Sequence, residues 1–223
     1  MFRLIPIFIL IAVQAQAGAW PRAEGETFVS LAVETGPFSV NADMQTQLIQ
    51  AIDGYAMLYV ERGLPNDTTL GLDATGKQTE LTKAISFMRW PIALPGKSAV
   101  LAVEFGLGMA NEEFALRPGL SYGRGFSLGS LQGWLSVDGR ALLIDAEHST
   151  LEADMTLGFK PWTDHMLILQ LQTGASAEHG THATFAPSYV LPVSPGRHLE
   201  IGMATGVESA SEIKVKLGLW HRF

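Results

Sequence analysis

The sequence predicts an all-β fold: a single up-and-down antiparallel transmembrane β-barrel of about twelve strands, which occupies residues 18–223. Three observations predict it. Of the 223 residues, 47% are hydrophobic and only 17% are charged, whereas an ordinary soluble domain carries about 25% charged residues. After residue 20, no apolar run approaches the roughly 18 residues of a membrane helix. Apolar and polar residues alternate instead, which excludes a disordered chain, a helical membrane protein and a coiled coil.

Residues 1–17 have the features of a secretory signal peptide. Arg3 supplies a positive charge, residues 4–13 form an apolar core interrupted only by Pro6, and Ala15-Gln16-Ala17 is a small-x-small cleavage pattern. Cleavage there makes Gly18 the first residue of the mature chain and sends the protein out of the cytoplasm. A membrane anchor is the alternative, but the apolar run is too short to span a bilayer.

The alternation of apolar and polar residues predicts twelve strands. The final segment is the clearest: Ile213, Val215, Leu217 and Leu219 alternate with Lys214, Lys216, Gly218 and Trp220. Residues 99–109, 151–159 and 199–207 repeat this pattern, whereas residues 87–90 alternate poorly and make the fourth strand the weakest. The predicted strands cover residues 27–35, 54–62, 68–75, 81–91, 98–109, 113–123, 130–141, 149–160, 165–174, 181–192, 197–207 and 212–223.

The connections fall into two groups. Compact turns are predicted at residues 65–67, 95–96, 161–164 and 195–196, each beginning with proline. Longer connections, at residues 75–80, 174–180 and from Gly36 to Asp53, lie at the opposite end of the barrel. The last of these contains a predicted short helix at residues 44–52 and is long enough to be a functional loop.

The last strand resembles that of the Gram-negative outer-membrane β-barrel family, whose members end in alternating apolar residues and a C-terminal aromatic. Val215, Leu217, Leu219 and Phe223 match this motif, while His221 stands where the family more often has tyrosine. The resemblance implies a member of that family in the outer membrane, surrounded by its lipid. It also implies that these four residues are the signal for the barrel-assembly machinery. The hairpin at residues 59–73 is similar to hairpins in such barrels but identifies no activity.

The charged residues of the strands occupy the face opposite the apolar one, which faces the barrel interior. Buried charges must be paired or hydrated, so a ladder of ion pairs is expected. Lys214 or Lys216 is expected to pair with the carboxylates of the neighbouring strands, Glu200 on the eleventh and Glu34 on the first. The predicted lumen-lining charges are Glu34, Glu61, Asp73, Glu104, Arg117, Asp138, Arg140, Glu152, Asp154, Lys160, Glu200, Lys214 and Lys216; Arg222 is a further cation on this face.

Two passive functions fit a barrel of this size: a narrow channel for small solutes or ions, or a structural barrel with a plugged interior. Twelve strands lie between small filled barrels and the open porins of roughly 16–18 strands. A small acidic excess among the predicted interior charges favours cations. An outer-membrane lipid hydrolase, a soluble secreted β-barrel or sandwich that binds a small ligand, and a loop-mediated metal or adhesion module remain alternatives.

No catalytic, cofactor or metal residues are predicted, and the protein is not expected to be an enzyme. His148 and Ser149, near Asp145, point to opposite faces of a strand, and His182 and Ser188 lie roughly 20 Å apart. His179 and His182 are expected to be solvated. The chain has no cysteine, and its net charge of -7 argues against nucleic-acid binding.

Aromatic residues at strand ends predict the interfacial girdles of a membrane barrel. These residues are Trp20, Trp90, Trp162, Tyr189, Trp220 and Phe126, with Phe126 and Trp162 placed in short periplasmic turns.

Overall fold

The computed structural model describes residues 18–39, 43–46, 53–77, 80–94, 99–177, 180–208 and 212–223. The predicted signal peptide (residues 1–17), the turn at 95–96, His179 and most of the predicted helix at 44–52 lie outside these residues. Of that helix, Met44, Gln45 and Thr46 are described, and they are helical. Within the described residues, no helix combines the length and the apolar character needed to cross a membrane.

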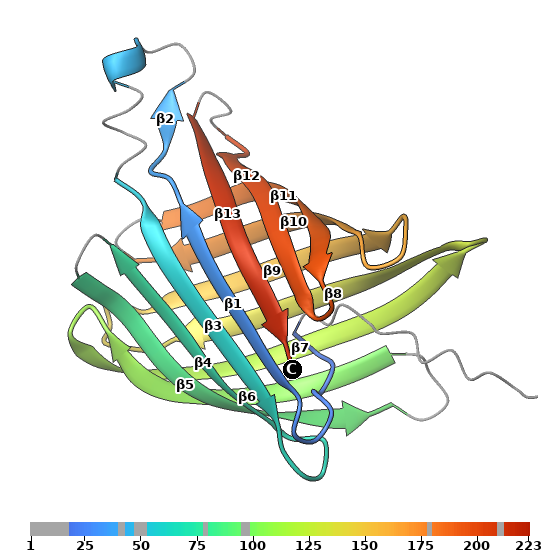
Figure 1. The fold of residues 1–223 in the computed structure, drawn as a ribbon. Coiled ribbons are helices and arrows are strands. Elements are labelled where there is room, and N and C mark those ends of the chain that lie inside the picture. The colour runs from blue at the N-terminus through green and yellow to red at the C-terminus, as the bar shows by residue number, and fades with distance from the viewer. Residues whose placement is uncertain are drawn as a thin grey trace, which may run out of the picture.

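Twelve strands of the described chain form one closed, all-antiparallel, up-and-down barrel, which confirms the predicted fold class (Figure 1). Each strand pairs with the next along the chain, and the last pairs with the first. A short strand, β2 (Phe38–Ser39), pairs with the beginning of β13. The barrel strands are β1 (Thr27–Glu34), β3 (Tyr55–Gly63), β4 (Thr69–Lys77), β5 (Glu80–Ala93), β6 (Ala99–Ala110), β7 (Glu113–Leu128), β8 (Leu131–Leu142), β9 (Thr150–Lys160), β10 (Met166–Ser176), β11 (Gly180–Ser194), β12 (Arg197–Gly206) and β13 (Glu212–Arg222).

The two ends of the barrel differ. At one end, here called the terminal end, β1 begins and β13 finishes; Thr27 and Phe223 exchange two backbone hydrogen bonds of 2.7 and 3.0 Å. The turn at residues 64–68 and the turn at residues 195–196 lie at the same end. The opposite end, here called the loop end, carries β2 and the helical turn (Figure 1).

Every predicted strand corresponds to an observed one, but several predicted boundaries are wrong. β7 continues to Leu128 rather than residue 123, because the hairpin turns on only Gly129 and Ser130, with Gly129 at φ +64°. Connections at the loop end are not uniformly long. Asn111 and Glu112 alone join β6 to β7, both with positive φ, as a tight two-residue hairpin requires.

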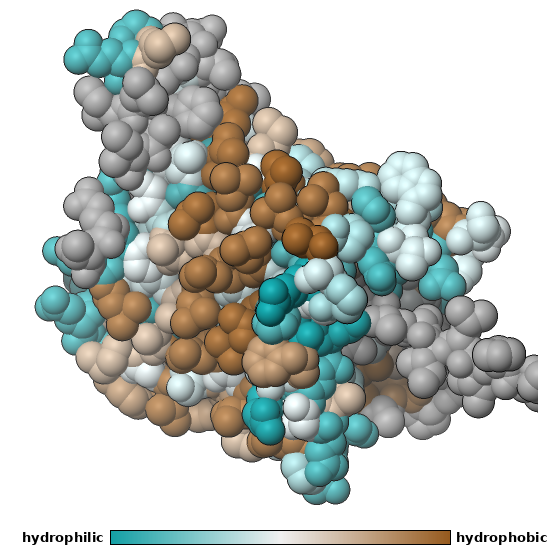
Figure 2. Space-filling model, in the orientation of Figure 1, coloured by the Kyte–Doolittle hydropathy of each residue, from teal (hydrophilic) through white to brown (hydrophobic). Residues whose placement is uncertain are grey.

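The two faces of the barrel wall separate by chemistry. On β6, Val103, Phe105 and Leu107 are exposed on the outside, whereas Ala102 and Glu104 are buried inside. Apolar side chains gather over the wall formed by β1, β12 and β13, and hydrophilic ones gather at its lower rim (Figure 2). Such a band suits hydrocarbon, because closure pairs the backbone groups of all twelve strands within the sheet.

Candidate functional site: the barrel interior

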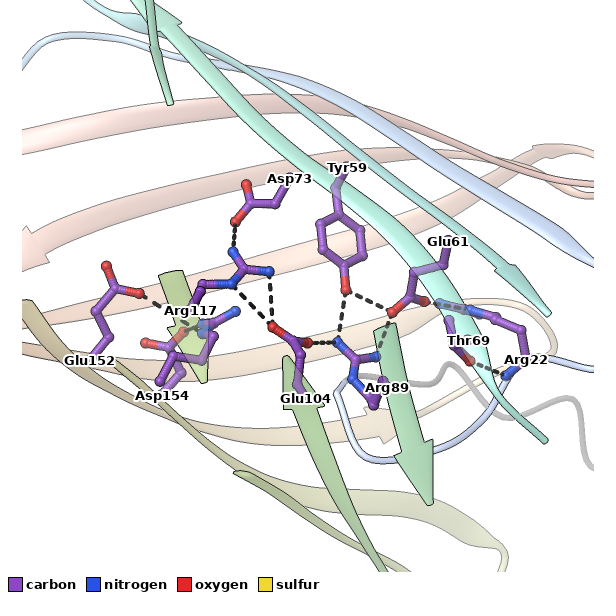
Figure 3. Close-up of polar contacts among 11 residues, drawn as sticks. Arg22, Tyr59, Glu61, Thr69, Asp73, Arg89, Glu104, Arg117, Glu152 and Asp154 are labelled. Atoms are coloured by element: carbon purple, nitrogen blue, oxygen red, sulfur yellow. Dashed lines mark hydrogen bonds and ion pairs between the residues drawn. The ribbon is translucent and has the colours of Figure 1, made fainter. Parts of the chain in front are cut away.

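A chain of alternating charges runs along the inner face of β3 to β7. Arg22 binds Glu61 (2.6 Å), Glu61 binds Arg89 (2.6 Å), Arg89 binds Glu104 (2.8 Å) and Glu104 binds Arg117 (2.9 Å). Arg117 then reaches Asp73 (Figure 3). Lys83 also contacts Asp73, at 3.0 Å. We call these seven residues the ion ladder: Arg22, Glu61, Asp73, Lys83, Arg89, Glu104 and Arg117.

Most residues of the ion ladder have an oppositely charged partner on each side, and these partners offset the cost of burying their charges. A lone buried ion is costly, and only close opposite charges with good hydrogen bonds offset that cost. The Tyr59 hydroxyl donates a 2.7 Å hydrogen bond to Glu61, and Arg89 donates one of 3.2 Å to the same hydroxyl. The guanidinium groups of Arg89 and Arg117 each lie 5.1 Å from the centre of the Phe87 ring, which adds cation–π attraction.

Three ladder cations were missed by the sequence analysis. Lys83 and Arg89 lie on β5, where poor alternation left the inward face unassigned, and Arg22 precedes the first strand. The signal for Arg89 was its cross-strand partner, since it faces Glu104 in the register of β5 and β6. With these cations added, the acidic excess expected of the interior is gone, so that expectation was wrong.

A second group of charges lies on β8 and β9, and here carboxylates outnumber cations. Arg140 binds Asp154 (2.5 Å) and lies 3.9 Å from Glu152. Figure 3 shows the two carboxylates. Asp138 faces Asp154 directly across the two strands. We call Asp138, Glu152 and Asp154 the acidic cluster. Among the ion pairs of the described residues, Arg140 is the only cation of this cluster.

A third group closes the barrel between β12, β13 and β1. Lys216 lies 3.1 Å from Glu200, and Lys214 lies 3.3 Å from Glu34. The strand order predicted that Lys214 or Lys216 would pair with these carboxylates, and in the structure each lysine pairs with one of them. The Trp220 indole N–H also donates to Glu200, at 3.1 Å.

Most of the predicted lumen-lining charges border one cavity of about 560 Å³. The nine that do so are Glu61, Asp73, Glu104, Asp138, Arg140, Glu152, Asp154, Glu200 and Lys216. Arg117 is enclosed within the ion ladder, and Glu34 and Lys214 pair nearer the loop end. Lys160 is the last residue of β9, at the terminal end.

The cavity extends along the barrel. Gly196 and Arg222 line it at the terminal end, and Thr75 and His182 line it towards the loop end. Part of its wall is polar but uncharged: Gln172 donates to Gln170 (2.8 Å), which donates to Thr156 (3.4 Å). An ion ladder therefore faces an uncharged hydrogen-bonding wall across open space.

The segment before β1, residues 18–26, enters this interior from the terminal end; we call it the N-terminal segment. Its Arg22 side chain binds Glu61 of β3, and the Arg22 backbone N–H donates to Thr69 of β4. Its Trp20 packs in a buried cluster with Trp134 of β8, Met166 of β10 and Val190 of β11. The segment thus joins one side of the barrel to the other.

The predicted aromatic girdle is correct only in part. Trp20 is buried in the interior cluster and Trp220 bonds to Glu200, so both face inward. Trp220 shares the inward face of β13 with Lys214 and Lys216, and Trp20 is carried inside by the N-terminal segment. Phe126 is part of β7, not of a turn, and its ring contacts Phe159. Trp90 and Trp162 are exposed, Trp162 in the turn at residues 161–165.

The histidine and serine candidates form local loop structure. The Asp145 carboxylate accepts hydrogen bonds from the backbone N–H of His148 (2.7 Å) and Glu147 (2.8 Å), and contacts the His148 ring at 2.7 Å. The Ser149 hydroxyl donates to the Asp145 carbonyl and accepts from the Ile144 N–H. Asp145, His148 and Glu113 also place ligand atoms within 4.8 Å of one another, but all three are exposed. His182 packs over Gly174 in the interior.

A closed twelve-stranded barrel with an apolar exterior and a charged, hollow interior is the architecture of outer-membrane channels. The chain matches no family model and no curated protein sequence.

Solved structures of this architecture are similar in fold. The KdgM porin aligns with a TM-score of 0.65 and 9% identity, over 88% of this chain and 99% of that one. The NanC porin aligns with a TM-score of 0.62 and 9% identity, over 87% and 98%. An outer-membrane channel from Pseudomonas putida F1 aligns with a TM-score of 0.57 and 10% identity, over 94% and 100%.

Proposed function

We propose that this protein is a passive outer-membrane channel for small hydrophilic solutes. The observation that carries the proposal is the cavity of about 560 Å³, which is lined by residues from both ends of a closed barrel. The apolar outer band and the fold shared with porins support the location. In this proposal the protein reaches the membrane after its signal peptide is removed behind Ala17, with both termini in the periplasm.

The interior chemistry supports small neutral or zwitterionic solutes rather than a strongly charged polymer. Charges of both signs alternate along the ion ladder, so the wall presents no continuous strip of one sign. One structure of the KdgM porin holds disordered oligogalacturonate. A polyanion of that kind would meet Glu61, Glu104 and the acidic cluster here, and we therefore expect it to pass poorly.

Two experiments test the proposal, the first of folding and the second of transport. The protein is isolated from outer membranes, and its mobility on an SDS gel is compared before and after boiling. A heat-dependent shift with β-rich circular dichroism is expected of a closed barrel. Solubility in plain buffer without a shift would contradict the membrane location.

Swelling of proteoliposomes in solutions of small sugars then measures transport, with protein-free liposomes as control. Uptake that falls steeply with solute size is expected of a narrow channel. One observation favours a structural barrel instead, namely that the N-terminal segment crosses the interior. A folded protein that gives neither swelling nor conductance in planar bilayers would establish that second function.

A further inference from the structure

The acidic cluster has one cation for three carboxylates, and Arg140 forms ion pairs with only two of them, Glu152 and Asp154. Asp138 and Asp154 stand opposite each other on β8 and β9, an arrangement that is destabilising for two like charges. Arg140 binds Asp154 and approaches Glu152. Asp138 is only 8% exposed, yet within the described residues it forms no hydrogen bond and no ion pair, and Arg140 attracts it only at longer range.

Gly18, the first residue of the proposed mature chain, lies against this carboxylate. A β-carbon built on Gly18 would fall 1.8 Å from Oδ1 of Asp138 and 2.7 Å from Oδ2, so the Gly18 backbone is in direct contact with the Asp138 side chain. The α-nitrogen is one bond from the same α-carbon. Gly18 and Asp138 both line the central cavity, and Trp20 anchors the segment two residues further on.

We propose that signal-peptide cleavage creates the missing cation: the new α-ammonium group of Gly18 forms a buried ion pair with Asp138 and holds the N-terminal segment in the lumen. Hydrolysis of the Ala17–Gly18 amide consumes one water and leaves a carboxylate on Ala17 and an ammonium on Gly18. Before cleavage the same nitrogen is an uncharged amide with one N–H. Afterwards it carries a positive charge and three N–H donors.

The ion pair makes the segment a latch with two attachment points. Arg22 fixes one end to Glu61 on β3, and Gly18 fixes the other to Asp138 on β8. Only the mature chain has both. The inference rests on the proposed cleavage site, but it does not depend on whether the barrel conducts.

The first experiment measures the reactivity of the Gly18 α-amine. Full-length protein is expressed, the processed form is purified from outer membranes, and its N-terminus is identified by mass spectrometry. The folded barrel is then treated with 2-pyridinecarboxaldehyde, which modifies N-terminal amines, and the rate of labelling is followed by mass. An N-terminus other than Gly18 would overturn the inference without bearing on the channel.

Asp138→Asn is the test variant, and Glu200→Gln is the control, because Glu200 is an interior carboxylate paired elsewhere, with Lys216. A carboxylate that holds the amine protonated lowers its reactive fraction by about tenfold for each pKa unit of stabilisation. We therefore expect labelling about tenfold faster in D138N than in wild type, and unchanged in E200Q. Equal rates in wild type and D138N would overturn the ion pair.

A second variant keeps the test decisive if D138N does not fold. Gly18→Ala retains every charge but places a methyl group where Asp138 lies, at a φ of +59° that alanine rarely adopts. It should free the amine and accelerate labelling. A folded G18A barrel that labels at the wild-type rate would show that Gly18 does not depend on Asp138.

Discussion

At the scale of single residues, the interior is stabilised by side chains with several partners at once. Arg89 binds Glu61 and Glu104, contacts Tyr59 and lies over Phe87. Phe87 fits because its ring lies against Gly71, where an added β-carbon would be 2.1 Å from Cζ. This small neighbourhood is the centre of the ion ladder.

Replacing Arg89 with methionine is expected to be strongly destabilising. It leaves two buried carboxylates short of a partner, and breaking a buried ion pair costs about 3–5 kcal/mol. The free energy of unfolding in detergent, measured by urea titration of the gel-mobility shift, should fall by that order. Lys77→Met is the control, because the Lys77–Asp53 pair is exposed and its loss should leave stability unchanged. An equal effect of the two substitutions would contradict the energetic role of the ladder.

The sequence predicted residues of the ladder unevenly. Glu61, Asp73, Glu104 and Arg117 followed from strand parity. Arg89 was not predicted, because Phe87, two residues before it, also points inward and makes the inner face of β5 resemble an apolar outer face. Gly71, which accommodates the Phe87 ring, has no side chain that would assign it to either face. Contacts that depend on a glycine, which has no side chain, cannot be recognised from the alternation of apolar and polar residues.

At the scale of elements, the loop between β8 and β9 (residues 143–149) is organised by one carboxylate. The backbone N–H of His148, followed by its side chain and the N–H of Glu147, lowers the pKa of Asp145 to about 2. A depressed carboxyl pKa stabilises the loop above the ordinary pKa of 3.8, and that stabilisation is lost as the pH falls through about 2.

Hydrogen exchange at the His148 amide provides the measurement. Protection relative to the unfolded chain is expected to hold near neutrality and to disappear between about pH 4 and pH 2. Asp145→Ala should remove it at every pH, while the strand amides of β8 stay protected. Protection in D145A equal to that of wild type would show that other contacts order the loop.

The family resemblance implies that Phe223, the C-terminal aromatic residue, acts in assembly of the barrel. Phe223 is 65% exposed, and its bonds to Thr27 are made by the backbone. Phe223→Ser is therefore expected to leave the unfolding midpoint of the refolded barrel nearly unchanged but to reduce the amount assembled in outer membranes. Phe185→Ser on β11 makes the same chemical change on another outward position and is the control. Equal losses of assembly would contradict a special role for the C-terminus.

The strands were the part of this structure that the sequence predicted best. All twelve barrel strands were predicted, and all but β5 alternate clearly, because a wall with hydrocarbon on one side and a polar interior on the other imposes a period of two. Turns were less predictable. Proline marked most of those at the terminal end, but Gly129-Ser130 at that end and Asn111-Glu112 at the loop end carry weaker signals and were missed or misplaced.

At the scale of the whole molecule, the N-terminal segment narrows the interior. Trp20→Ala removes the ring that packs against Trp134, Met166 and Val190. The segment should then no longer be held with Gly18 and Arg22 in the cavity, and the passage should widen. Single-channel conductance is expected to rise above that of wild type. Trp162→Ala, in an exposed turn, should leave it unchanged. A conductance that does not respond to W20A would place the permeation path away from the segment.

The sequence did not predict that the N-terminal segment lies inside the barrel. Residues 18–26 lie between the cleavage pattern and the first alternating strand, and nothing in their order indicates that they fold back across the lumen. Strand parity describes a wall, not what fills the space it encloses. Trp20 was accordingly assigned to the girdle, although it is among the buried residues.

The seam between β1 and β13 has a consequence for how the chain reaches its membrane. Because the first and last strands are hydrogen-bonded neighbours, from Phe28 opposite Arg222 to Glu34 opposite Lys216, a nascent or truncated polypeptide that lacks its final strand leaves two sheet edges unpaired. Unpaired edges with an apolar face promote aggregation in water. The barrel can therefore close only once β13 has been made and paired with β1, so its final strand is needed before any earlier part of the wall is sealed.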